Sequence, residues 1–184
     1  VEPGETTRPT LDDVVAGRCR EEDLEVYGYM NRGELRARAA AEAPDLADRI
    51  DRAVDKNPVT GKSLQVLGTS VLVNIINAHG MFPTENFRRG VFNDAEGTSG
   101  EKIAEALLER QSACYKCPIG CGRTTRTKDK RGEGPEYETV WAFGAHLGVS
   151  DLTAITEANY ACNELGLDTI TMGSTIGCGM ELSE

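Results

Sequence analysis

The sequence predicts a mainly α-helical domain with long irregular loops and little or no β-sheet. Apolar residues recur every three or four positions in several stretches between residues 33 and 184, which is the spacing of amphipathic helices. Small polar residues or glycines stand where many of these stretches begin or end. Alternation of apolar and polar residues, the pattern of a half-buried strand, is weak throughout. These observations favour an irregular packing of helices.

Most of the expected helices have a local reason to begin or end where they do. Pro44 is expected to break a charged helix that carries Leu46, Ile50 and Val54 on one face. Gly166 is expected to end the helix that precedes it. Polar caps are expected at Thr10, Ser99 and Asp151. The expected helices cover residues 33–55, 64–79, 99–108, 136–147, 152–165 and 167–180, with a turn at 57–61 and a hairpin or exposed loop at 124–131.

Length and composition fit one domain of a folded protein. The 184 residues are 39% hydrophobic and 27% charged, which is ordinary for a chain that buries a core. A net charge of −10 disfavours a nucleic-acid or anionic membrane surface, and the longest apolar run, 71–76, is too short to cross a membrane. The chain shows neither a signal peptide nor an initiator methionine, and the missing methionine indicates that the sequence here starts mid-chain. Unpaired cysteines with a cluster-like loop point to the cytoplasm. Residues 1–32 are not diagnostic, and the helical domain is placed at 33–184.

Three cysteines in a compact loop are the strongest chemical signal. Cys114, Cys117 and Cys121 follow the spacing C-x2-C-x3-C, with glycines that let the loop fold tightly. Lys116 and Arg123 add positive charge, which favours thiolate over thiol. Three thiolates in so short a span predict a metal or iron–sulfur site.

Alternatives remain for this loop. A structural zinc site usually has two pairs of ligands, and no second pair is present, although zinc or plain buried thiols stay open. A four-iron cluster normally takes four cysteines. Cys19, Cys162 and Cys178 are single candidates for the fourth ligand, which otherwise lies outside this sequence.

Four stretches together resemble the aldehyde ferredoxin oxidoreductase family of tungsten or molybdenum enzymes. They are residues 83–87 (PTENF), the cysteine loop 114–123, residues 133–139 (EGPEYET) and residues 163–169 (NELGLDT). Their order and separation are similar to those of the second, helical domain of that family, and the similarity covers roughly residues 55–184. The cysteine loop together with the EGPEYET stretch is specific.

The resemblance implies a set of cofactors and roles. Cys114, Cys117 and Cys121 would hold a [4Fe–4S] cluster, with the fourth cysteine in a C-terminal domain absent here. A tungsten or molybdenum bis-pyranopterin would lie beside it, and Glu138 would be the acid that assists attack on the aldehyde carbonyl. On pattern alone, Glu138 is an ordinary acid at a helix N-terminus. The implied pterin-binding residues are Asn163, Gly166, Leu167, Asp168 and Thr169, with Arg123 between cluster and pterin.

The implied partners are ferredoxin as electron acceptor, an aldehyde substrate, the missing N- and C-terminal domains of the same chain, and a second copy if the protein is a homodimer. Without those domains the fragment alone is not expected to be active. Asn163 departs from the family, which has aspartate there, and Glu157 is followed by Tyr160 where relatives carry a Glu-x-x-His pair. Two other functions stay open: an iron–sulfur electron-transfer module without catalysis of its own, and a zinc-stabilised helical interaction domain.

Overall fold

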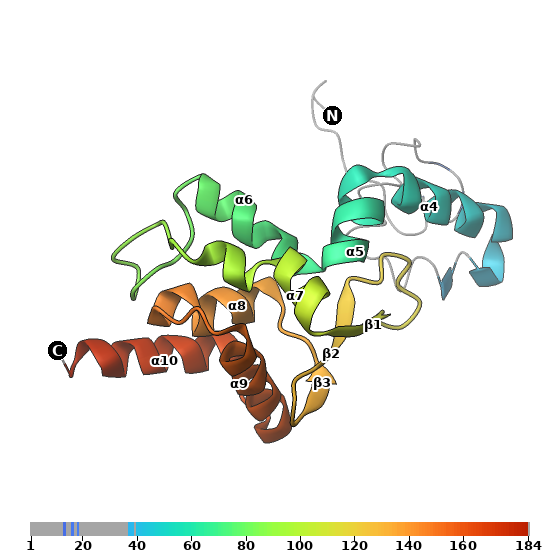
Figure 1. Ribbon diagram of the computed structural model, residues 1–184. Helices are drawn as coiled ribbons and strands as arrows, with labels where there is room; N and C mark the ends of the chain where they lie inside the picture. Colours follow the sequence, from blue (N-terminus) through green and yellow to red (C-terminus); the bar gives the residue numbers. More distant parts are fainter. Residues whose placement is uncertain (1–12, 14–15, 17, 19–36, 39, 184) are drawn as a thin grey trace. The chain divides into compact units, whose positions relative to one another are not determined.

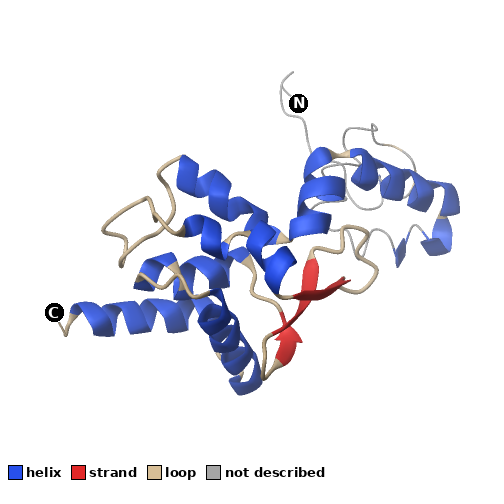
Figure 2. Ribbon diagram, viewed as in Figure 1, coloured by secondary structure: helices blue, strands red, loops and turns tan. Residues whose placement is uncertain are grey.

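A computed structural model describes residues 13, 16, 18, 37–38 and 40–183 (Figure 1). This described part is mainly helical with one small antiparallel sheet, which confirms the predicted fold class (Figure 2). The contacts divide the chain into two compact units. Unit 1 combines the chain up to Lys62 with Ala113–Gly120, and unit 2 combines Ser63–Ser112 with Cys121–Glu184. The predicted boundary after residue 32 lies outside the described residues, as do Thr10 and Cys19.

Helix α4 (Pro44–Lys56) forms the described core of unit 1. The expected break occurs at Ala43, whose φ of −150° is not helical, and Pro44 then begins α4. Proline suits this position because the first turn of a helix leaves its N–H groups without partners in any case. The predicted apolar face is confirmed, since Leu46, Ile50 and Val54 are 5%, 0% and 4% exposed.

The expected turn at residues 57–61 is wrong, because the chain forms a π-helix there (η1, Pro58–Leu64). The Asn57 side chain accepts hydrogen bonds from the backbone N–H groups of Val59 and Thr60 at 2.8 and 3.2 Å. The Thr60 hydroxyl also donates to the Val54 carbonyl at 2.6 Å. Asn57 therefore caps the next helical segment.

Unit 2 holds the remaining elements. They are α5 (Gln65–Leu67), η2 (Thr69–Val71), α6 (Leu72–Ala78), η3 (Ala95–Thr98), α7 (Gly100–Ala106), β1 (Leu108–Ser112), β2 (Gly122–Arg126), β3 (Arg131–Glu133), α8 (Tyr137–Phe143), η4 (Ala145–Leu147), α9 (Leu152–Leu165) and α10 (Thr169–Glu181). The last two agree closely with the predicted helices. Asp151 caps α9 by accepting hydrogen bonds from the N–H groups of residues 153 and 154, as expected.

Two expected helices are interrupted by glycine. The helix predicted over 64–79 breaks at Gly68, whose φ is +69°. The helix predicted over 136–147 breaks at Gly144, after which the chain continues as the short 3-10 turn η4. A Cβ at Gly144 would lie 2.3 Å from the Val140 carbonyl oxygen, so the backbone turns there in a space that only glycine fits.

The small sheet has the order β1-β2-β3, with antiparallel pairs. Gln111 pairs with Arg123, and Ser112 pairs with Gly122. The hairpin expected in 124–131 is confirmed as the β2–β3 connection. Strand β1, rather than the end of a helix, leads the chain into the cysteine loop, because α7 ends at Ala106.

The core of unit 2 is built around α8, whose residues Val140 and Ala142 are fully buried. In Figure 1, α8 (orange) lies along α10 (red), and α9 runs from them toward β3. The helices α8 and α10 come unusually close at Gly173, where a Cβ would lie 2.6 Å from the Ala142 carbonyl oxygen. Glycine at this position therefore sets the distance between the two helices.

No single helix in the described part of the chain is long and apolar enough to span a membrane. The segments 58–67 and 69–78 pass that test of length and composition only when taken together, and the pair is sharply bent at its break.

Candidate functional site

The cysteine loop is divided between the two units. Cys114 is exposed and Cys117 half-buried in unit 1, where the Cys117 N–H donates to the Cys114 carbonyl at 3.0 Å. Cys121 begins the second segment of unit 2. Gly120 has a φ of +63°, in line with the expectation that glycine lets this loop turn tightly. No cysteine among the described residues is in a disulfide.

Within residues 40–183 and the few described before them, no three side chains of histidine, cysteine, aspartate or glutamate gather as a metal site. Because Cys121 belongs to a different unit from Cys114 and Cys117, the three-cysteine ligand set stays a prediction. The donor set itself fits iron, since thiolate sulfurs are the usual ligands of iron–sulfur clusters.

Arg123 is almost fully buried, at 3% exposure, two residues after Cys121. Its guanidinium donates to the carbonyls of Leu64 and Gln65 at 3.1 and 3.2 Å. Burial lowers the pKa of Arg123, while the nearby Glu136 and Cys121 act in the opposite direction. Its Nε has no hydrogen-bond partner among the described residues. A buried cation with a spare N–H beside a thiol is an environment that suits an anionic cluster.

Glu136 and Thr69 fix the entry into α8. The Thr69 hydroxyl donates to the Glu136 carboxylate, and the Tyr137 N–H donates to the Thr69 oxygen at 2.9 Å. Burial raises the pKa of Glu136, and the hydrogen bond from Thr69 opposes this shift. The sequence does not single out Thr69, because nothing near it indicates a contact with Glu136 and Tyr137, which lie 67 and 68 positions further along the chain.

Glu138 lies in the first turn of α8 and is exposed, while its neighbours Tyr137 and Thr139 are buried. The Trp141 indole N–H donates to the Glu138 carboxylate one turn further along the helix. This hydrogen bond holds the carboxylate against the helix. Glu138 is therefore a fixed, solvent-facing carboxylate on a buried helix.

The turn between α9 and α10 forms as the sequence predicts. Gly166 takes a φ of +68°, and the Leu167 N–H donates to the Cys162 carbonyl at 2.9 Å, which closes the end of α9. Asp168 caps α10 by accepting from the Thr171 N–H at 2.7 Å, and hydrogen bonds from Thr171 lower the pKa of Asp168. The turn is exposed from Asn163 to Asp168.

Replacing Gly166 by alanine is expected to destabilise this turn by about 1 kcal/mol, because a residue with a Cβ is disfavoured at a positive φ. No atom lies within 4 Å of the Cβ position, so only the backbone conformation contributes. Denaturant midpoints of a full-length protein carrying this segment measure the effect. Gly166→Asn, which tolerates this conformation better, is the matched control. Equal losses for Ala and Asn would contradict the explanation.

The structure brings together two of the predicted site segments. The Thr139 and Thr169 hydroxyl oxygens lie 2.9 Å apart, so the residue after Glu138 touches the first residue of α10. The EGPEYET stretch and the NELGLDT stretch, thirty residues apart at this contact, are therefore neighbours in unit 2. The sequence gives no signal for this pair beyond two threonines at helix starts.

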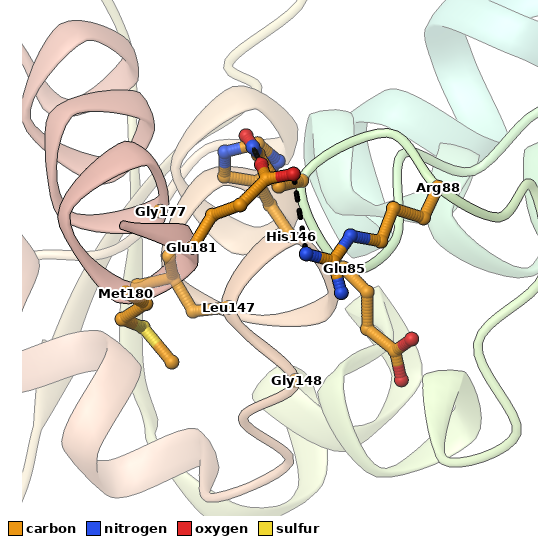
Figure 3. A pocket seen from close by; sticks show the side chains of 9 residues that line it. Glu85, Arg88, His146, Leu147, Gly148, Gly177, Met180 and Glu181 are labelled. Carbon is orange, nitrogen blue, oxygen red and sulfur yellow. Dashed lines mark hydrogen bonds and ion pairs between the residues drawn. The ribbon is translucent and has the colours of Figure 1, made fainter. Parts of the chain in front are cut away.

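A pocket of about 230 Å³ lies in unit 2 between the loop after α6 and the end of α10 (Figure 3). Glu181 of α10 accepts a hydrogen bond from Asn86 and pairs with Arg88 at 3.1 Å. The backbone of residues 85–87 has φ values of 47°, 50° and 63°, a run of left-handed residues in the PTENF stretch. The Asn86 N–H holds this run in place by donating to the His146 carbonyl at 2.9 Å.

His146 is 1% exposed beside this pocket, and neither ring nitrogen has a hydrogen-bond partner in the part of the chain that the structure describes. The ring packs edge-on against Phe87 and Trp141, with centroid distances of 4.9 and 5.6 Å. Burial lowers the pKa of His146, which favours the neutral ring.

Comparison with known proteins adds to this geometry. The family described as "Aldehyde ferredoxin oxidoreductase, domains 2 & 3" matches residues 45–184, and the chain belongs to this family.

The similar relatives are named tungsten-containing aldehyde ferredoxin oxidoreductases. The one from Pyrococcus furiosus is 54% identical over 129 residues, which cover 70% of this chain and 21% of the relative. The one from Thermococcus kodakarensis is 52% identical over the same length and coverage. The one from Pyrococcus horikoshii is 52% identical over 140 residues, which cover 76% of this chain and 23% of the relative. The chain thus spans about a fifth of the length of these curated relatives.

Proposed function

We propose that the complete protein containing this segment oxidises aldehydes to carboxylic acids in the cytoplasm and transfers the electrons to ferredoxin. The overall reaction consumes an aldehyde and water and releases a carboxylic acid, two protons and two electrons. The observation that carries the proposal is the contact between the Glu138 helix and the turn at 163–169, in a chain about half identical to tungsten aldehyde oxidoreductases.

Two groups would supply the redox chemistry. Cys114, Cys117 and Cys121 would hold a [4Fe–4S] cluster together with a cysteine from outside this segment, and the turn from Asn163 to Thr169 would contact a tungsten bis-pyranopterin. When bound, the pyranopterin metal supplies the two-electron chemistry and the cluster carries electrons to the acceptor. The buried charge of Arg123 would stabilise the negative cluster from the side of Cys121.

Glu138 would act as the general base. Its carboxylate faces solvent on one side and is held by the Trp141 N–H on the other, so it is positioned to accept a proton from the water that attacks the aldehyde carbonyl. The attack forms a C–O bond and breaks the C=O π bond, whose electron pair moves to the carbonyl oxygen, while the water proton passes to a Glu138 oxygen. A carboxylate fixed on a buried helix loses little freedom on doing so.

Glu138→Gln is expected to lower kcat/KM for aldehyde oxidation by about 10²- to 10⁴-fold, because glutamine keeps the shape of the side chain but cannot accept the proton. Steady-state kinetics of a full-length protein carrying this segment measure the loss, with tungsten and iron content checked in parallel. Glu101→Gln is the matched control, since Glu101 is also an exposed acid in the first turn of a helix, α7. Normal turnover of Glu138→Gln would rule out the base role.

Metal analysis separates this function from the two alternatives. Tungsten or molybdenum with iron and acid-labile sulfide supports the enzyme. Iron and sulfide alone would indicate an electron-transfer module without its own catalysis, and zinc alone would indicate a metal-stabilised interaction domain.

A further inference from the structure

A single buried amide connects the two ends of the EGPEYET stretch. Asn159 lies in α9 and is 4% exposed. Its Nδ2 donates to the Glu133 carbonyl at 2.8 Å, and its Oδ1 accepts from the Thr139 hydroxyl at 3.4 Å. Glu133 and Thr139 bracket the segment that carries Glu138. One side chain therefore spans the segment from its first residue to its last.

The connection continues to the turn before α10. Thr139 is 4% exposed, and its hydroxyl oxygen lies 2.9 Å from that of Thr169, the first residue of α10. The sequence of contacts runs from the Glu133 carbonyl through Asn159 and Thr139 to Thr169. It thus links β3, α8, α9 and α10, which are all elements of unit 2.

Asparagine is chemically suited to this position. Its amide offers a donor and an acceptor at once, and here each has a partner. Aspartate has the same shape but lacks the donor, and leucine lacks both. Buried polar networks with satisfied members favour one arrangement of the groups around them, since any other arrangement leaves a polar atom without a partner.

The neighbouring residue strengthens the same attachment. The Tyr160 hydroxyl lies 2.7 Å from the Thr125 hydroxyl of β2, and a Cβ on Gly132 would lie 2.7 Å from the Tyr160 ring. Tyr160 is 3% exposed, so this contact is part of the core. Residues 159 and 160 of α9 together hold the hairpin end from which the EGPEYET stretch departs.

We propose that Asn159, acting through Thr139, is a positioning residue that fixes where the Glu138 carboxylate lies relative to the turn at 163–169. This inference rests on the proposed function, because it concerns the placement of the base relative to the turn that would contact the cofactor. Thr139 lies in α8 and Asn159 in α9, and both are 4% exposed, so the proposal gives neither a direct contact with substrate. Their effect is on where the exposed carboxylate lies.

The test uses a full-length protein carrying this segment, assayed for aldehyde oxidation and for thermal unfolding. Thr139→Val and Asn159→Asp are expected to lower kcat by about 10- to 100-fold with little change in KM, because a small displacement of a catalytic group can lower rates by that factor. Thr139→Ser, which keeps the hydroxyl, is expected to restore most of kcat. If Asn159→Asp does not fold, the comparison of Thr139→Val with Thr139→Ser still tests the proposal.

Thr156→Val is the matched control. Thr156 lies in α9, the helix that also carries Asn159, and is 0% exposed. Its hydroxyl donates to the Leu152 carbonyl of the same helix at 2.8 Å. It is expected to lower the unfolding temperature about as much as Thr139→Val while leaving kcat unchanged. Equal kcat for Thr139→Val and Thr156→Val in a protein that oxidises aldehydes would overturn the positioning role alone. A parent protein without aldehyde oxidation would overturn the proposed function and this inference with it.

Discussion

Cys121→Ser is expected to remove most of the iron and sulfide from a full-length protein carrying this segment, together with the visible absorbance of the cluster. Thiolate sulfur is the ligand that iron–sulfur clusters require, and serine oxygen is a harder donor that rarely replaces it. Cys121 also lies near the buried Arg123 guanidinium, so among the three predicted ligands it is the one whose loss removes a charge partner of Arg123, while Glu136 remains. Chemical assay of iron and sulfide, with the visible spectrum, measures the effect.

Cys178→Ser is the matched control for that experiment. Cys178 is an exposed thiol on α10, outside the predicted ligand loop, and the proposed cluster takes its fourth cysteine from outside this segment. It is expected to keep its full iron content. A Cys121→Ser protein that retains iron and sulfide at the level of Cys178→Ser would contradict the ligand assignment, and loss of zinc in place of iron would support the interaction-domain alternative.

Gly173→Val is expected to be among the most destabilising single changes in α10, by about 1–3 kcal/mol or more, because it overpacks a close contact. A Cβ at this position would lie 2.6 Å from the Ala142 carbonyl oxygen and 2.9 Å from the Ala142 side chain. Backbone atoms cannot move aside as a flexible side chain can, so α10 must shift away from α8. Thr169 would move with α10, away from Thr139, and the stability loss should be accompanied by a loss of turnover.

Gly179→Ala supplies the comparison on the same helix. No atom lies within 4 Å of a Cβ at Gly179, so alanine meets open space. Alanine has a higher helix propensity than glycine, and a gain of up to about 1 kcal/mol is expected. Chemical denaturation of both variants gives the two free energies of unfolding. A loss at position 173 that is no larger than the change at position 179 would contradict the explanation by the close contact.

The local parts of the fold could be predicted from sequence because their causes are local. Ser99 and Asp151 cap helices whose first turns follow directly, and Gly166 ends a helix through its own backbone conformation. The break at Gly68 was missed because its reason is distant. A Cβ there would lie 3.1 Å from the Cys121 carbonyl oxygen and 3.2 Å from the Arg123 Nε, which sequence patterns do not reveal.

The candidate site divides in the same way. Glu138 and the turn at 163–169 could be singled out from their motifs, since each motif is continuous in sequence. The buried polar residues that connect them could not, because Asn159 contacts partners 20 and 26 residues away. Arg123 was expected near the cluster, but its burial against the Leu64 carbonyl was not, since an arginine in a strand is more often at the surface.

The pairing of Ser112 with Gly122 has a consequence for how the cysteine loop would bind the proposed cluster. Strand pairing holds the Cα atoms of Ser112 and Gly122 about 5 Å apart. The conformational entropy of closing the loop between them is therefore lost when the sheet forms, before any metal binds. The proposed cluster would then assemble on a loop whose two ends the folded sheet already holds together.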